Sequence, residues 1–169
     1  MRLNTSNRNK LKEFKRLGLA ELECYSVDLP EPDASPLEVI ASKATQVGEM
    51  IIVEDTSLDI DGADVGINIK WLTDSLDQHL GKRAVFRVLL GVQRNGCIEV
   101  YVGEVQGTIV TPKGQGFGFD PYFLPDGSKH TLGEEKPDCF NARALAVVNF
   151  LNENPSNLLE PLYWSGEWQ

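Results

Sequence analysis

The first third of the chain alternates between apolar runs and segments with a helical pattern, and this alternation restricts the fold more than any other feature. Strand-like runs occupy residues 2–5, 22–27 and 51–53, and helical patterns occupy residues 7–17 and 35–47. Apolar residues three and four positions apart form one face of a helix, whereas short apolar runs between turn residues form strands. The order β-α-β-α-β therefore predicts an α/β fold with helices packed on a sheet.

The remainder of the chain predicts a hairpin and a last helix. Residues 85–92 and 97–110 flank Arg94-Asn95-Gly96, and Asn-Gly is a strong signal for a tight hairpin turn. Residues 71–80 and 141–151 show helical patterns. The whole chain is therefore expected to form a mixed sheet with helices packed on it, as one domain or as two small lobes that share a core.

The second helix has a defined start. Ser35 is a candidate N-cap, Pro36 takes the first helical position, and Glu38 follows three residues after the serine. This spacing is a capping-box pattern, in which the serine and the glutamate each satisfy a backbone N–H. The helix is expected to run to about Val47.

Composition excludes several classes of protein. The net charge is −9, with 25 acidic against 16 basic residues, so most of the surface repels a nucleic-acid backbone. The three cysteines form no CxxC pair, which argues against a disulfide framework or a zinc site and fits a cytoplasmic protein. No apolar run approaches 18 residues, and the first residues contain no leader-like apolar stretch, so no contact with a membrane is expected.

The sequence IIVEDTSLDID, residues 51–61, places four carboxylates directly after an apolar run. Crowded carboxylates repel one another unless cations, donors or water relieve them. Two interpretations remain open for these acids, Glu54, Asp55, Asp59 and Asp61. They form a magnesium site at the strand end, because Mg²⁺ binds one or two carboxylates together with water and phosphate oxygens, or they face water on a solvated edge.

Three other stretches are candidates for chemistry. The turn and helix start at LNTSNRNK carry basic residues where backbone N–H groups attract phosphate; the alternative is a capped surface helix. Glu31, in the proline-rich loop LPEP, is free of capping duty and is a candidate ligand; the alternative is a solvated acid. The loop GFGFDPYF offers aromatic faces and an acceptor to a planar base; the alternative is a loop packed under its own sheet.

The order of these stretches resembles the inosine triphosphate pyrophosphatase family. The motifs that carry the resemblance run from residue 3 to about residue 150, and each is weak alone. They are Thr5-x-Asn7-x-x-Lys10, Leu29-Pro30-Glu31, Lys43, Val53-Glu54-Asp55-Thr56, Lys70-Trp71 and Phe117-Gly118-Phe119-Asp120-Pro121.

The resemblance implies a mixed α/β homodimer with a long central mixed β-sheet, flanking helices and two lobes around a nucleotide-binding cleft. Residues 1–169 would form a single nucleoside triphosphate pyrophosphatase domain. The implied reaction is Mg²⁺-dependent hydrolysis of (deoxy)nucleoside triphosphates such as ITP, dITP and XTP to monophosphate and pyrophosphate. Two alternatives stay open: a pyrophosphatase retuned to a different base, and a catalytically weak nucleotide-binding regulator.

The resemblance also implies roles for individual residues. The metal would be bound by Glu31 and Asp55, and Asp55 would orient or deprotonate the attacking water. The phosphates would be held by Thr5, Asn7, Lys10 and Lys43. The remaining substrate contacts would come from Thr56, Lys70, Phe117, Gly118, Phe119 and Asp120.

The chain departs from the family in the segment EEKPDCFNARAL. The family commonly has a lysine and then Ser-His-Arg before this helix. Aligning on Arg143 puts Glu135 in place of the lysine and Cys139-Phe140-Asn141 in place of Ser-His-Arg. A shift of one residue restores Lys136 but gives Phe140-Asn141-Ala142, so neither alignment keeps the histidine and the arginine. The resemblance still places Lys136, Phe140 and Asn141 at the substrate. A histidine and an arginine donate hydrogen bonds to a 6-oxo purine, whereas an asparagine amide offers a donor and an acceptor and can be turned over. We therefore expect relaxed or altered base selection.

Overall fold

The computed structural model describes residues 1–63, 73–116 and 118–169. The chain divides into two units, which are described separately below. Unit 1 contains residues 1–55, 89–102 and 146–169. Unit 2 contains the described residues within 56–88 and 103–145.

Unit 1 begins with the predicted β-α-β-α-β order. Its strands are β1 (Arg2–Asn4), β2 (Glu23–Tyr25) and the first half of β3 (Ile51–Ile60). β1 lies between the other two and is parallel to both, with Arg2 opposite Glu23 on one side and Ile51 on the other. The helices between them are α1 (Arg8–Arg16) and α2 (Pro36–Val47). The carboxyl ends of β1 and β2 therefore lie at the same edge, beside the first half of β3, which continues beyond them.

Helix α2 starts as the sequence predicts. The Ser35 hydroxyl accepts from the Glu38 amide, and the Glu38 carboxylate accepts from the Ser35 amide at 3.0 Å. Pro36 takes the first turn, where its missing N–H costs nothing. The capping box thus sets the first turn of the helix that carries Lys43.

The predicted hairpin is confirmed. Strands β4 (Arg83–Arg94) and β5 (Cys97–Ile109) are joined by Asn95 and Gly96, whose φ angles are 51° and 73°. Positive φ at both positions is what a type I′ turn requires. The Glu49 carboxylate closes the turn by accepting from both of its amides, at 3.0 and 2.8 Å.

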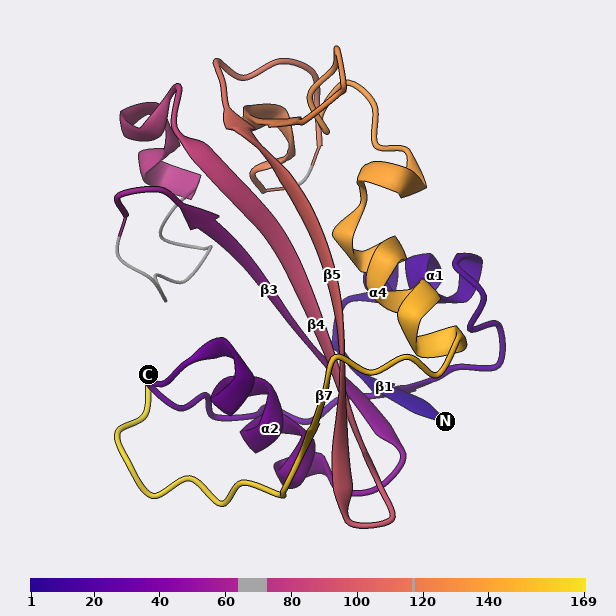
Figure 1. The fold of residues 1–169 in the computed structure, drawn as a ribbon. Helices are drawn as coiled ribbons and strands as arrows, with labels where there is room; N and C mark the ends of the chain where they lie inside the picture. Colours follow the sequence, from indigo (N-terminus) through magenta and orange to yellow (C-terminus); the bar gives the residue numbers. More distant parts are fainter. Residues whose placement is uncertain (64–72, 117) are drawn as a thin grey trace. The chain divides into compact units, whose positions relative to one another are not determined.

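The strands form one mixed sheet with the order β2-β1-β3-β4-β5-β6, and β7 (Asn157–Leu159) pairs antiparallel with β5. This confirms the predicted mixed α/β class. In unit 1, α2 packs an apolar face on the sheet, and β7 and the following residues lie along the same helix (Figure 1). The core cluster contains Ile40, Ala41, Ala44, Val53, Leu89, Ile98 and Val100.

Unit 2 is organised around three phenylalanines. Phe86 on β4 packs edge-on against Phe119, with ring centroids 5.0 Å apart, and against Phe123, 6.2 Å away. Its short elements are the 3₁₀ turns η1 (Thr73–His79), η2 (Asp120–Tyr122) and η3 (Asp138–Phe140), and strand β6 (Phe123–Pro125). The helical pattern predicted for residues 71–80 therefore appears as a 3₁₀ turn within its described part.

Helix α4 (Ala142–Leu151) is the last helix and matches the predicted one to within a residue. It starts in unit 2 and continues into unit 1. Among the described residues, no helix is long and apolar enough to cross a membrane. The three cysteines are free thiols.

Candidate functional site

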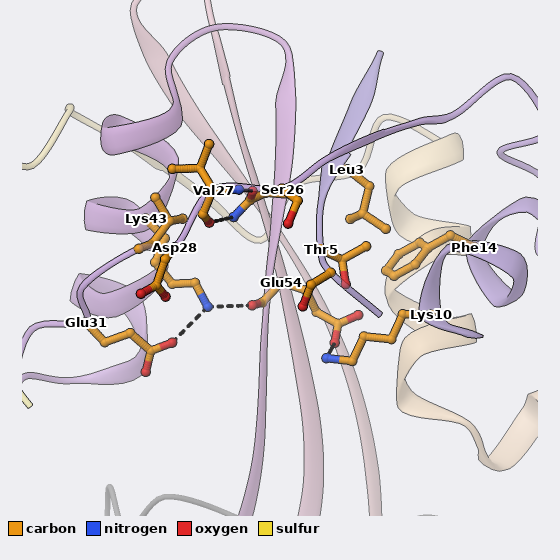
Figure 2. Close-up of a pocket in the computed structure, with 13 residues that line it drawn as sticks. Leu3, Thr5, Lys10, Phe14, Ser26, Val27, Asp28, Glu31, Lys43 and Glu54 are labelled. Carbon is orange, nitrogen blue, oxygen red and sulfur yellow. Dashed lines mark hydrogen bonds and ion pairs between the residues drawn. The ribbon is translucent and has the colours of Figure 1, made fainter. Parts of the chain in front are cut away.

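A pocket of about 470 Å³ lies in unit 1 at the carboxyl ends of the parallel strands. Ligands bind at this edge of α/β sheets because the loops and helix N-termini that follow the strands gather there. Figure 2 shows the pocket and the side chains around it. It is lined by Leu3, Asn4, Thr5, Ser6, Lys10, Phe14, Ser26, Val27, Asp28, Leu29, Glu31, Lys43 and Glu54.

One wall of the pocket is fixed by Asn4, at the end of β1. Its side-chain amide donates to the Val27 carbonyl at 3.1 Å and accepts from the Val27 amide at 2.9 Å. The side chain thus continues the β1–β2 pairing beyond the strands. The Thr5 amide donates to the Tyr25 carbonyl at 2.8 Å. Together these bonds hold the turn after β1 against the loop after β2.

The turn after β1 leads directly into α1. Asn7 is the N-cap, and its side-chain oxygen accepts from the amides of Asn9 and Lys10 at 2.9 and 3.3 Å. The Asn7 amide donates to the Thr5 hydroxyl at 3.0 Å. The capped-helix alternative is therefore correct for Asn7, whose Oδ1 serves the helix. This does not exclude a phosphate at the same helix start, because Asn7 Nδ2 and the Thr5 hydroxyl can still donate.

Two lysines enter the pocket from different helices and meet at Glu54 (Figure 2). Lys10 from α1 pairs with the Glu54 carboxylate at 3.1 Å. Lys43 from α2 donates to the Glu54 carbonyl at 2.8 Å and pairs with the Glu31 carboxylate at 3.1 Å. The Glu54 side chain is only 5% exposed and that of Lys43 13%. The resulting network holds residues from α1, α2, β3 and the loop after β2 together.

Asp55 follows Glu54 in β3 and has an unusual electrostatic environment. Burial raises the pKa of its carboxyl from the ordinary 3.8 to about 6, while the charge on Lys43 acts in the opposite direction. The charges on Glu31 and Glu54 raise this pKa further, and that on Lys10 lowers it. Within the described parts of the chain, no hydrogen bond or ion pair reaches the Asp55 carboxylate. A desolvated carboxylate with a raised pKa beside a pocket is typical of a functional group.

The donors at this pocket suit a hard divalent cation. Three carboxylates, from Asp28, Glu31 and Glu54, line the pocket with two lysines, and Asp55 adds a fourth acid beside it. Among the described residues, no three acidic, histidine or cysteine side chains lie close enough to enclose a metal by themselves. Mg²⁺ needs no such cage, because one or two carboxylates, water and substrate phosphates complete its shell.

The predicted base-recognition residues belong to unit 2. Asp120 is buried, and both of its carboxylate oxygens lie 3.3 Å from Lys136 Nζ, which also lies over the Phe86 ring at 5.7 Å. Phe119 is 5% exposed and is part of the aromatic core of this unit, which is the packing alternative considered for its loop. Gly118 has a φ of 62°, a conformation that favours glycine.

The expectation that Asn141 turns its amide over is not supported by its surroundings. The side chain is 1% exposed, and its Oδ1 accepts from the Arg143 amide at 3.1 Å at the start of α4. Turning the amide over would set an NH₂ group against that N–H, which a buried site disfavours. Phe140, by contrast, is half-buried in η3, and Thr56 follows Asp55 in β3.

The structure thus brings together four of the predicted residues in one pocket: Thr5, Lys10, Glu31 and Lys43. Asp55 is coupled to them electrostatically, and Asn7 caps the helix that carries Lys10. Lys70 and Phe117 lie outside the described residues. Sequence reasoning considered Glu54 only as one of four acids of a possible magnesium site, gave it no individual role, and did not assign Asn4 to the site. Glu54 is part of the motif Val53-Glu54-Asp55-Thr56, but only the fold shows that Lys10 and Lys43 both contact it.

Comparison with known proteins identifies the family. The sequence pattern of the Ham1 family matches residues 1–153. The chain belongs to the Ham1 family. It is 33% identical over 174 positions to the dITP/XTP pyrophosphatase of Pyrobaculum aerophilum, an alignment that covers 86% of this chain and 91% of that protein.

Other relatives agree with this assignment. The inosine triphosphate pyrophosphatase of Batrachochytrium dendrobatidis is 30% identical over 183 positions, which cover 91% of this chain and 94% of that protein. The structure of the Staphylococcus aureus Ham1 protein matches with a TM-score of 0.70 at 21% identity, covering 90% of this chain and 95% of that one, and so shares the fold. The resemblance inferred from the motifs is confirmed, and this Ham1-family chain has the fold expected of it.

The raised pKa of Asp55 predicts how its replacement changes stability with pH. Because the folded-state pKa lies above 3.8, the folded protein binds more protons than the unfolded chain between about pH 4 and 6. The stability associated with protonated Asp55 is present below pH 4 and is lost as the pH rises through 6. Asp55→Asn should therefore stabilise the metal-free protein at pH 7.5, by at most about 3 kcal/mol, with little difference near pH 4.

Thermal unfolding in EDTA at both pH values measures this difference. Asp61→Asn is the matched control, because Asp61 is exposed and carries the same charge; it should show no such pH-dependent gain. Equal stability of Asp55→Asn and the parent protein at pH 7.5 would mean that the Asp55 carboxylate is not desolvated.

Proposed function

We propose that this chain hydrolyses nucleoside triphosphates with purine bases such as hypoxanthine and xanthine (ITP, dITP, XTP) to the monophosphate and pyrophosphate, with Mg²⁺ as cofactor. Both units belong to one catalytic domain, residues 1–169. The observation that carries the proposal is the pocket at the strand ends, where two lysines are paired with two carboxylates, those of Glu54 and Glu31. The activities named for the relatives from Pyrobaculum and Batrachochytrium support the same reaction.

The lysines are suited to the phosphates. Lys10 and Lys43 are point charges on flexible stems and can leave a carboxylate for a phosphate oxygen with little strain. In the proposal, both lysines contact the triphosphate, and Thr5 and Asn7 donate to it at the start of α1. The Glu31 carboxylate that Lys43 leaves then becomes available to another cation. Carboxylate oxygens of Glu31 and Asp55 would hold Mg²⁺, which when bound neutralises charge on the phosphates.

Asp55 is the candidate general base. A carboxylate with a pKa of about 6 is largely ionised at neutral pH yet more basic than an exposed aspartate. In the proposal it accepts a hydrogen bond from the attacking water and takes its proton as the phosphoryl bond breaks. Water held in this way attacks in one orientation, which removes much of the entropic part of the barrier. Thr56 and Lys70 are proposed as further substrate contacts.

The base would be read by groups of unit 2. We propose Phe117, Gly118 and Phe119 as the wall of the base site, and Lys136, Asp120, Phe140 and Asn141 as the groups around its polar edge. Phe140 has no conventional donor, and the Asn141 oxygen is occupied at the start of α4. A site that lacks two strong donors to a 6-oxo group discriminates less between purines.

We also propose that the chain acts as a homodimer, on the resemblance alone. Light scattering tests this against the 18.8 kDa mass of one chain.

The phosphate role of Lys10 predicts a selective kinetic defect. Lys10→Ala should lower kcat/KM for triphosphates by about 10- to 100-fold, because one charge-assisted contact is lost in a partly buried pocket. Lys12→Ala is the matched control, since Lys12 lies on the same helix and is exposed; its kcat/KM should stay within about twofold of the parent value. If both substitutions changed kcat/KM by a similar, small factor, Lys10 would not bind phosphate and α1 would be only a surface helix.

Base selection is tested with a panel of ribo- and deoxyribonucleoside triphosphates, measuring pyrophosphate release with Mg²⁺ and with EDTA. We expect release only with Mg²⁺, and a preference for ITP and XTP over GTP and ATP of less than about 100-fold, because a hydrogen-bond-reading site would reach about 10⁴-fold. A preference of that larger size would contradict relaxed selection. No release from any triphosphate would favour the nucleotide-binding regulator.

A further inference from the structure

The loop between β2 and α2 carries Glu31, the proposed metal ligand. Residues 26–35 form neither helix nor strand beyond one isolated bridge residue, Pro32. An irregular surface loop is mobile unless other parts of the chain hold it. A ligand must be held closely in its productive geometry, so the contacts that fix this loop matter for the site.

One side of the loop is held by α2. The Gln46 side chain donates to the Pro30 carbonyl at 3.0 Å, and Lys43 pairs with the Glu31 carboxylate at 3.1 Å. The second contact is the one that the proposed function removes, because Lys43 is expected to move to a phosphate. Glu31 then needs a support that the substrate does not compete for.

That support comes from residues 160–169, here called the tail segment. Two backbone hydrogen bonds join the loop to this segment: the Gln169 amide donates to the Glu31 carbonyl at 2.9 Å, and the Asp33 amide donates to the Glu167 carbonyl at 2.9 Å. Between these bonds Pro32 and Trp168 form an antiparallel bridge. The Gln169 side chain adds a bond to the Pro32 carbonyl at 3.1 Å.

Pro32 suits its place in this bridge. A proline has no N–H to give to a sheet and is tolerated only where none is required. In this bridge both backbone bonds come from the residues beside the Pro32–Trp168 pair, so the missing N–H costs no hydrogen bond. The ring instead stiffens the chain next to Glu31.

The tail segment is itself anchored in unit 1. The Leu162 amide donates to the Thr45 hydroxyl on α2 at 2.8 Å, and Leu162 packs against the core cluster of unit 1. Farther along, the Trp164 indole donates to the Glu167 carbonyl at 2.7 Å. The same carbonyl therefore accepts from Trp164 and from Asp33, which joins the turn of the tail to the loop. In Figure 1 the end of the tail lies beside the start of α2.

We propose that residues 164–169 are a positioning element of the site: they fix the backbone of residues 31–33, so that the Glu31 carboxylate stays directed at the metal when Lys43 turns to the substrate. This inference rests on the proposed function. The Ham1-family match ends at residue 153, so the tail contacts are features of this chain beyond the matched pattern. The tail would act on metal binding without touching the substrate.

Gly166 offers a way to disturb the tail without touching the loop. A methyl group at this position would lie 2.7 and 2.9 Å from two carbons of the Trp164 ring, so the ring or the backbone must shift, and we expect this shift to weaken the Trp164 bond to Glu167. Ser165→Ala is the matched control, because it introduces the same residue at an exposed neighbouring position. Removal of residues 164–169 is the more complete change.

Two measurements on metal-free protein test the proposal, and one on the active enzyme extends it. In Gly166→Ala and in the truncated protein, we expect hydrogen exchange of the Asp33 amide to accelerate by at least about tenfold. The Kd for Mn²⁺, used as a spectroscopic probe by electron paramagnetic resonance, should rise by about tenfold. The half-saturating Mg²⁺ concentration for turnover should rise similarly, while kcat at saturating Mg²⁺ stays within about twofold. Ser165→Ala should match the parent protein in all three measurements.

Unchanged Asp33 exchange in the truncated protein would overturn the proposal, and so would faster exchange with unchanged Mn²⁺ and Mg²⁺ dependence. If the truncated protein lacks the circular dichroism spectrum of a folded protein, the Gly166→Ala variant alone tests the proposal, by its Asp33 amide exchange and its Mn²⁺ and Mg²⁺ dependence. If the parent protein releases no pyrophosphate, the proposed function is wrong. The exchange and Mn²⁺ measurements would still test whether residues 164–169 position Glu31.

Discussion

Glu54 is the residue on which the arrangement of the unit 1 pocket depends. Its carboxylate is almost fully buried and is paired with Lys10, and its carbonyl accepts from Lys43. A buried carboxylate is sensitive to the cations near it, because little water screens its charge. A triphosphate that draws Lys10 away from Glu54 leaves more negative charge at the pocket for a metal cation to offset. In the proposed reaction, substrate and Mg²⁺ binding favour each other for this electrostatic reason.

The four carboxylates after the apolar run of β3 divide between the two interpretations that the sequence left open. Glu54 and Asp55 belong to unit 1 and to the charged pocket environment. Asp59 belongs to unit 2, where it pairs with Arg87, and Asp61 is exposed. The proposed phosphate site therefore uses the first pair, whereas Asp59 serves an ion pair and Asp61 is exposed to solvent.

Features set by short-range interactions could be predicted from the sequence. The capping box at Ser35 and Glu38 and the turn at Asn95-Gly96 depend on residues within a few positions, and both formed as expected. The β-α-β-α-β succession along the chain followed from apolar patterning, whereas the parallel pairing with β1 between β2 and β3 was not predicted. The family motifs likewise identified Thr5, Lys10, Glu31 and Lys43, which the fold brings to one pocket.

Features that depend on distant pairings could not be read in this way. The Asn4–Val27 amide bonds join residues 23 positions apart, and the tail segment reaches the loop at Pro32 from 137 positions away. Asp120 was expected to accept from a base, but no local pattern showed that Lys136 would pair with it. The sequence suggested that the amide of Asn141 could be turned over. Its burial at the start of α4, which prevents this, depends on tertiary packing and is not visible in the local sequence.

The most direct test of the central claim is a crystal structure with Mg²⁺ and a non-hydrolysable ITP analogue. The account predicts that Lys10 Nζ leaves Glu54 and Lys43 Nζ leaves Glu31, that both contact phosphate oxygens, and that Glu31 and Asp55 are directed at the metal. Phosphates bound elsewhere, with the Lys10–Glu54 and Lys43–Glu31 pairs intact, would contradict it.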